Sequence, residues 1–161
     1  MASTVRGFAV RAVDTSHGRA DPGKCNVSVG KTNPQTNTIN LFTVVGSIVC
    51  DLAGIVSTVF GAVGQHLTIG VTGSPAAIAA APTVALNATA AGAIINSPSV
   101  LGGPLPAPVT VTGASSSLML LEISNTIITL TSDASTTGAI TWVLDWVPLM
   151  PKGASVTVTT N

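Results

Sequence analysis

The chain has 161 residues, a mean hydropathy of +0.60, and six basic residues balanced by six acidic ones, so its formal net charge is zero. Only 7% of the residues are charged, whereas about one-quarter are charged in an ordinary globular domain. Aromatic residues make up 3% and tyrosine is absent, which argues against recognition of nucleic acid by base stacking. A chain this poor in charge favours association, so we expect copies of itself or a partner to cover much of its surface.

Residues 1–40 are predicted to form an extended N-terminal arm, because they are polar, basic and interrupted by glycine and proline. Asp14 and Asp21 partly offset the positive charge, and the basic residues do not form a dense cluster. We therefore expect the arm to bind an acidic protein surface rather than nucleic acid, and to become ordered when bound. Its short apolar pieces, 8–13 and 27–29, are suited to adding a strand to another sheet. The candidate partner-binding residues are Arg6, Arg11, Arg19, Lys24 and Lys31.

From Ile39 the hydrophobic pattern has a period of two, which predicts β-strands. The first strand covers 39–52 and ends before a turn that Gly54 permits, and a second strand covers 55–60. A third strand covers 66–72. Its inward residues are Leu67, Ile69 and Val71, and Gly73–Pro75 closes it.

The middle of the chain has weaker signals. Residues 76–82 predict a helical turn that Pro82 ends, and 84–88 predict a short strand. Residues 92–108 contain four prolines and are expected to form a loop. Five further strands are then predicted over 109–112, 118–123, 127–131, 140–147 and 154–159.

Short strands with turn signals between them, at this spacing, are typical of a sandwich or a barrel. The sequence thus predicts an all-β protein: a single antiparallel β-sandwich or barrel-like domain over 41–161, preceded by the extended N-terminal arm over 1–40. The strand edges have no lysines to discourage pairing with other chains, so we expect a homo-oligomer.

Trp142 and Trp146 lie four residues apart in a predicted strand, so both point to the same face as Leu144. Packing in the core or in an oligomer interface is the favoured interpretation, because the two rings bury much apolar area. A platform for stacking a ligand is the alternative. Phe42, on the inward face of the first strand, is assigned to the same core or oligomer packing.

The sequence carries no common catalytic or nucleotide-binding motif, and we expect no enzyme activity, cofactor, metal or small-molecule substrate. A catalytic triad would need Asp51, His66 and one of Ser115, Ser116 or Ser117 to converge, and these residue types are too common to indicate chemistry. The carboxylates of Asp51, Glu122, Asp133 and Asp145 are expected to face solvent or a neighbouring subunit, with a carboxylate pair as the alternative.

Cys25 and Cys50 are the only cysteines, and two thiols in a reducing compartment are the favoured interpretation, while a single disulfide stays open. The N-terminus lacks the apolar run of a signal peptide, so secretion is not expected. Residues 41–64 are long enough to cross a bilayer, but Asp51 in their middle argues against a spanning helix.

Two segments resemble strand patterns of small tailed-phage virion proteins. Residues 41–56 read LFTVVGSIVCDLAGIV, and residues 138–149 and 153–158 read GAITWVLDWVPL and GASVTV. In that family a similar first strand opens the domain, and a similar tryptophan-containing hairpin closes it. The resemblance covers strand patterns rather than a catalytic signature, so no functional residue is carried over.

The resemblance implies a capsid decoration (cement) protein: a β-rich homotrimer, made in the host cytoplasm, that lies on the outer capsid surface of the virion. Such a protein clamps neighbouring subunits of the major capsid protein, and the basic arm would strap those subunits together. The implied partners are the major capsid protein and further copies of this chain, with neither nucleic acid nor a membrane. A phage tail or surface-fibre component is the alternative, and a membrane-active phage protein is a more remote one.

Overall fold

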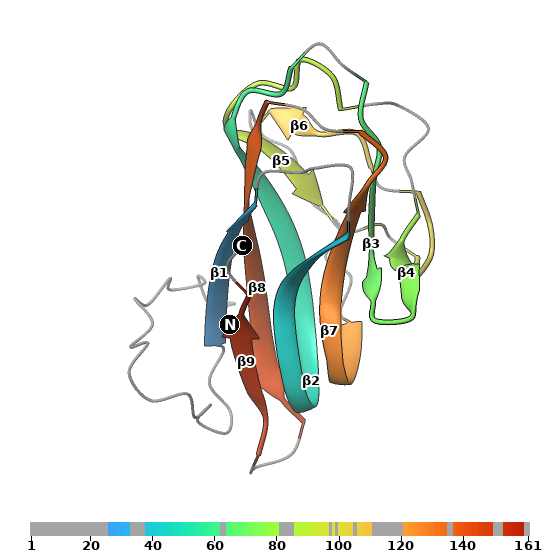
Figure 1. Cartoon of the computed structure of the whole chain (residues 1–161). Helices are drawn as coiled ribbons and strands as arrows, with labels where there is room; N and C mark the ends of the chain where they lie inside the picture. Colours follow the sequence, from blue (N-terminus) through green and yellow to red (C-terminus); the bar gives the residue numbers. More distant parts are fainter. Residues whose placement is uncertain are drawn as a thin grey trace, which may run out of the picture.

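The computed structural model describes residues 26–32, 38–61, 64–80, 86–96, 98, 100–104, 106–110, 121–134, 137–149 and 153–159. These residues form an all-β protein without a helix, which confirms the predicted fold class, and their antiparallel sheet curls into a half-barrel (Figure 1). The strands are β1 (Asn26–Thr32), β2 (Thr38–Thr58), β3 (Leu67–Val71), β4 (Ser74–Ala79), β5 (Ala93–Asn96), β6 (Val109–Thr110), β7 (Leu121–Ser132), β8 (Ala139–Pro148) and β9 (Ser155–Val158).

The sheet is organised around the 21-residue strand β2. Its main path runs β1-β8-β2-β7-β3-β4, and β5 and β9 also pair with β2. Along one edge of β2, β8 pairs with residues 48–58 and β9 with residues 42–45; along the other edge, β7 pairs with residues 38–50 and β5 with residues 53–55. One strand therefore holds four others in place, two on each edge.

The turn predicted at Gly54 is wrong, because β2 continues through this residue. Gly54 lies opposite Ile95 of β5 and Trp142 of β8. A Cβ at this position would lie 2.9 Å from the ring of Trp142 and 3.0 Å from Cγ2 of Ile140. The glycine provides room for a large aromatic side chain rather than a change of chain direction.

The strands predicted over 118–123 and 127–131 are not separated by a turn at Ser124 and Asn125, since β7 is one strand across these residues. The β2–β7 register shifts between Val44 and Ser47, which marks a β-bulge. Gly46 in this bulge has φ +75°, Asn125 has φ +46°, and the Gly46 N–H donates a hydrogen bond of 2.8 Å to Oδ1 of Asn125. Gly46 and Asn125 are residue types that usually indicate a turn, but in this fold they bend two paired strands.

Three further predictions change because pairing with another strand overrides local propensity. The helical turn predicted over 76–82 is wrong across the described residues 76–80, since β4 forms a hairpin with β3. The loop predicted over 92–108 contains β5, which pairs with β2. The segment 1–40, predicted as an arm, includes β1, which pairs along its whole length with β8. Residues 26–32 thus belong to the sheet.

The core is made of the residues that alternate inward along β2, β7 and β8. The period of two predicted from Ile39 places Phe42, Val44, Gly46, Ile48, Cys50 and Leu52 on one face of β2. Five of these six are at most 2% exposed, which confirms the prediction for them, and Gly46, in the bulge, is half-buried. The curl of the sheet brings β3, β4 and β5 over the same side chains. Their buried contributions are Leu67, Ile69, Ile78, Ala79, Ala93 and Ile95.

Candidate functional site

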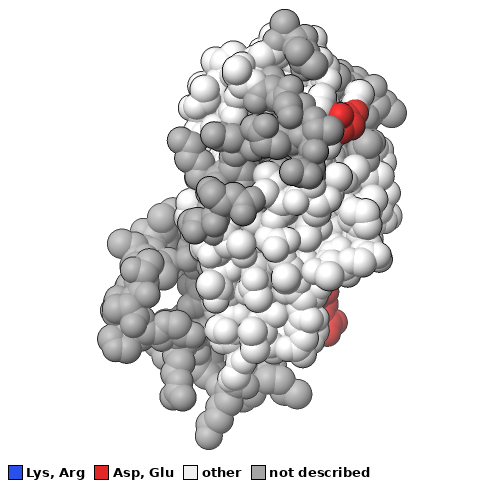
Figure 2. All heavy atoms as spheres, in the orientation of Figure 1, with Lys and Arg blue, Asp and Glu red and all other residues white. Residues whose placement is uncertain are grey.

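The basic residues predicted to bind a partner lie mostly beyond the described part of the chain. Arg6, Arg11, Arg19 and Lys24 are outside the described residues, and of Lys31 only the backbone is described, in β1 opposite Thr141. Figure 2 shows one side of the molecule, on which the described residues carry acidic atoms in two places and are otherwise uncharged.

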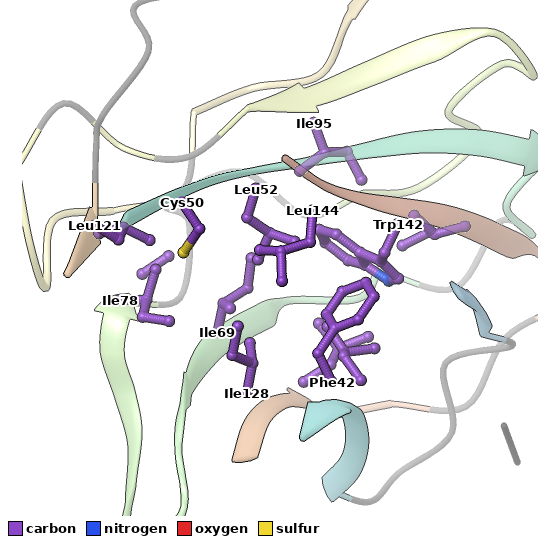
Figure 3. Close-up of a cluster of buried hydrophobic side chains, with 14 of the residues drawn as sticks. Phe42, Cys50, Leu52, Ile69, Ile78, Ile95, Leu121, Ile128, Trp142 and Leu144 are labelled. Carbon is purple, nitrogen blue, oxygen red and sulfur yellow. The ribbon is translucent and has the colours of Figure 1, made fainter. Parts of the chain in front are cut away.

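The aromatic residues singled out from the sequence lie in the core. Trp142 and Phe42 are 0% exposed and Trp146 is 5% exposed. Figure 3 shows Trp142 and Phe42 in one cluster with Leu52, Leu144 and Ile128. In the single chain these rings fill the curled sheet, so they do not offer a stacking platform at the surface.

His66 pairs with an aspartate other than the one a triad would require. Its Nδ1 lies 2.7 Å from Oδ2 of Asp133, and its backbone N–H donates a 2.7 Å hydrogen bond to Oδ1 of the same carboxylate. Although slight burial acts in the opposite direction, these hydrogen bonds and the charge of His66 lower the pKa of Asp133. The contact joins the start of β3 to the end of β7, while the predicted serines 115–117 lie outside the described residues.

A buried polar cluster lies beside this contact. Gln65 is 0% exposed, and its Nε2 donates to Oγ of Ser132 at 2.5 Å and to the carbonyl oxygen of Ala134 at 2.8 Å. The Ser132 hydroxyl donates to the same carbonyl at 2.7 Å. This hydroxyl therefore holds Ala134, at the start of the β7–β8 connection, and is not directed at His66.

The structure brings Asp51 and Asp145 directly opposite each other on β2 and β8. Both side chains are half-buried on the side of the sheet away from the core. Burial raises the pKa of both carboxyls; for Asp51 the charge of Asp145 adds to this, against an opposing hydrogen bond with the Leu52 backbone. Like charges directly opposite on paired strands are destabilising, so this arrangement is unusual for a purely structural sheet.

Apolar side chains surround the two carboxyls. On β2, Val49 is half-buried and Ile55 is 40% exposed; on β8, Val143 and Val147 are half-buried. Strand β1 extends this surface, since Val29 is 53% exposed and lies opposite Val143. We call this surface the outer face, and it consists of Val29, Val49, Asp51, Ile55, Val143, Asp145 and Val147.

The sequence contains a signal for this outer face, since Asp51 and Asp145 are each the one charged residue in an apolar strand. The sequence does not show that these two aspartates lie opposite each other, because their pairing depends on the register between strands almost one hundred residues apart. The predicted alternative of a carboxylate pair is thus present in the fold.

Cys50 lies on the opposite side of β2 from Asp51 and is a buried free thiol, while Cys25 is outside the described residues. Burial, with a contribution from the Asp51 carboxylate, raises the pKa of Cys50 to about 12. Burial therefore favours the protonated form of this thiol at neutral pH.

Within the described residues no three histidine, cysteine or acidic side chains gather as a metal site would require. The same part of the chain contains no helix long and apolar enough to cross a membrane. No protein-family model, curated protein or solved structure matches the chain. Core packing does not explain the paired carboxyls and the exposed apolar side chains of the outer face, which is therefore the candidate functional site.

Proposed function

We propose that this chain is a structural virion protein: a homotrimeric capsid decoration protein that clamps neighbouring subunits of the major capsid protein on the outer shell. The observation that carries the proposal is the outer face, which leaves apolar side chains exposed in a chain with almost no charge. The mechanism is mechanical. Each copy would bury surface against the other copies of the trimer, and its basic N-terminal segment would strap the capsid subunits.

The arrangement of the strands supports this proposal. The two segments that resemble phage virion proteins are far apart in the sequence, yet they form β2, β8 and β9, and both later strands pair along the same edge of β2. The resemblance therefore falls on one continuous block of the sheet, although β8 and β9 pair with β2 and not with each other, so the described residues do not form the closing hairpin that the resemblance implies.

The low charge also supports a structural role. Between residues 38 and 149 the chain has four acidic side chains and no basic one. Subunits of permanent assemblies bury large, apolar interfaces. The exposed Val29 and Ile55 and the half-buried valines of the outer face are suited to such an interface.

Co-sedimentation with capsid shells stripped of accessory proteins tests the function. We expect saturable binding with a stoichiometry that matches the three-fold positions of the shell. If a folded, oligomeric protein does not bind shells and instead binds isolated tails, the protein is a tail or fibre component and the capsid role is wrong.

A deletion that leaves the sheet intact tests whether the basic segment binds the shell. Removal of residues 1–24 spares β1, whereas removal as far as Lys31 would also delete most of this strand. We expect the shorter deletion to keep its β circular dichroism spectrum and to lose shell binding. Undiminished shell binding by the deleted protein would show that the arm is not the strap.

A further inference from the structure

Strand β1 ends the sheet on the side of the carboxyl pair (Figure 1). One edge of β1 pairs with β8 over all seven residues, and among the described residues no strand pairs with the other edge. The N–H and C=O groups along such an edge are a template for pairing with another chain. The strand at the opposite end of the sheet, β4, is partly covered. The Gly102 N–H donates a hydrogen bond to the Ile78 carbonyl oxygen, and the Ala80 N–H donates to that of Gly103.

The register of β1 places this edge beside the carboxyl pair. Val27 of β1 lies opposite Asp145 of β8, which in turn lies opposite Asp51 of β2. Residues directly opposite each other share a face of the sheet, so these three positions form one row across the outer face. Lys31 lies opposite Thr141, four residues further along β1 and about 13 Å from that row. The one lysine of β1 therefore belongs to a different row from the two carboxyls of its own chain.

A second copy of β1 supplies a positive charge to the acidic row when the two strands pair antiparallel. Val29 is the central residue of β1, so complete overlap of two copies places Val29 opposite its own counterpart. The same register places Lys31 of each copy opposite Val27 of the other, in the row of the two carboxyls. A slip of two residues in either direction keeps the faces aligned but removes this match.

The match joins opposite charges and apolar surface. Two strand spacings, about 10 Å, separate β8 from β1 of the second copy. A lysine packs its carbon stem along apolar surface and keeps its ammonium group at the far end, so it can cross Val27 to reach Asp145. An edge lysine ordinarily discourages pairing, but in this register it meets a half-buried carboxyl. Val29, which is 53% exposed beside Val143, would be covered by its counterpart.

We infer that two copies of this chain pair antiparallel through β1, centred on Val29, with Lys31 of each copy neutralising the Asp51–Asp145 pair of the other. The contact has two-fold symmetry, and a residue of the second copy completes the acidic row of the outer face. A two-fold contact is distinct from the three-fold contacts of the proposed trimer, so it would join copies of different trimers. The inference thus goes beyond the shell-binding role and stands without it.

Charge reversal in the full chain tests the contact. Lys31→Glu would place like charges together in both halves of the two-fold contact, and so would Asp145→Lys. Each variant alone should raise the dissociation constant of the contact by at least about tenfold. Sedimentation equilibrium should show half the mass of the unaltered protein at concentrations where the latter is associated. An equimolar mixture of the two variants should regain the full mass, because both halves of the mixed pair then join opposite charges.

Two control variants change the charge equally at other positions. Glu122→Lys alters β7 opposite Val49, on the far side of β2 from β8, and Arg19→Glu alters a residue outside the described part of the chain. Both should associate as the unaltered protein does. Asp145→Lys places an opposite charge beside Asp51, so it should keep the β circular dichroism spectrum. A mixture that regains no mass, or variants as heavy as the unaltered protein, would overturn the inference.

A cysteine at the two-fold axis tests the register without altering charge. Opposite residues of antiparallel strands have Cα atoms about 4.5–5.5 Å apart, a separation that a disulfide spans. In a Cys25→Ser background, Val29→Cys should form disulfide-linked dimers with oxidised glutathione, whereas Val143→Cys, one strand further from the axis, should not. Absence of cross-linking at position 29, or equal cross-linking at both positions, would show that the inference is wrong. Shell binding is measured separately, so either failure would leave the capsid proposal standing.

Discussion

The two faces of the β2–β8 strand pair differ sharply, although they are made by alternate residues of the same two strands. The inner face packs Cys50, Leu52, Trp142 and Leu144 into the core, with each side chain at most 1% exposed. The outer face carries Asp51 and Asp145 among half-buried valines. The inner face thus stabilises the single chain, whereas the outer face costs it stability and is suited to an interaction.

Substitution of Trp142 by alanine should show the largest effect, because it empties the centre of the inner face. We expect a loss of about 3–5 kcal/mol in the free energy of unfolding, as for other buried aromatic residues. Urea denaturation followed by circular dichroism measures it. The control is Val143→Ala, one residue away on the outer face, which should cost about 0.5 kcal/mol or less. Similar losses in both variants would contradict the contrast between the faces.

Gly54→Ala tests the close approach of β2 to the ring of Trp142. The added methyl group would lie 2.9 Å from that ring, so the ring must shift and the core becomes strained. We expect a loss of about 1–3 kcal/mol in the free energy of unfolding. Combining Gly54→Ala with Trp142→Phe should restore part of the loss, and equal losses in the single and double variants would show that the ring is not the obstacle.

The carboxyl pair gives the outer face a distinctive pH dependence. The pKa values of Asp51 and Asp145 are raised above the ordinary value of 3.8. Between that value and the raised one, the folded protein holds more protons than the unfolded chain, so the free energy of unfolding should fall as pH rises. Asp51→Asn should remove part of this slope and stabilise the neutral protein by roughly 0.2–1 kcal/mol. Denaturation at several pH values, at a concentration where the protein is monomeric, measures both effects.

The pKa of Asp133 is shifted in the opposite direction, and substitution of this residue should have the smallest effect on the free energy of unfolding. Its pKa is lowered below 3.8, so its contribution is present above that value and is lost as pH falls through the lowered pKa. Because the contact with His66 is exposed, Asp133→Asn should cost less than about 1 kcal/mol at neutral pH. The same denaturation series should show slopes of opposite sign for the two sites, and equal signs would contradict the assignment.

Periodicity was sufficient to predict the class of the fold and which side of β2 is buried. The alternation from Phe42 to Leu52 and the spacing of Trp142, Leu144 and Trp146 carry that information directly. The length of β2 was not predictable, because Gly54 resembles a turn residue until the ring of Trp142 is placed against it. The bulge at Gly46 and Asn125 was not predictable for the same reason. Glycine and asparagine are typical both of turns and of bends in paired strands, and the sequence alone does not distinguish the two.

The candidate site was predictable only in its parts. Each aspartate in an apolar strand is visible as an anomaly, and the sequence also shows that five of the six basic residues lie within the first 31 positions. Their relation depends on the β2–β8 register, in which residue 51 meets residue 145. Register follows from the packing of the whole sheet, and no local pattern determines it.

The order in which the strands emerge during synthesis has a consequence for how the protein reaches its fold. Strand β2 ends at Thr58, but β7, β8 and β9 are made only between Leu121 and Val158. Until β7 is complete at Ser132, the central strand can pair only with β5, while the ribosome adds 74 residues beyond Thr58 at roughly 5–20 per second. Folding through such distant pairings is slow. A nascent chain of this protein would thus depend on holding chaperones, or on rapid completion, to escape aggregation during translation.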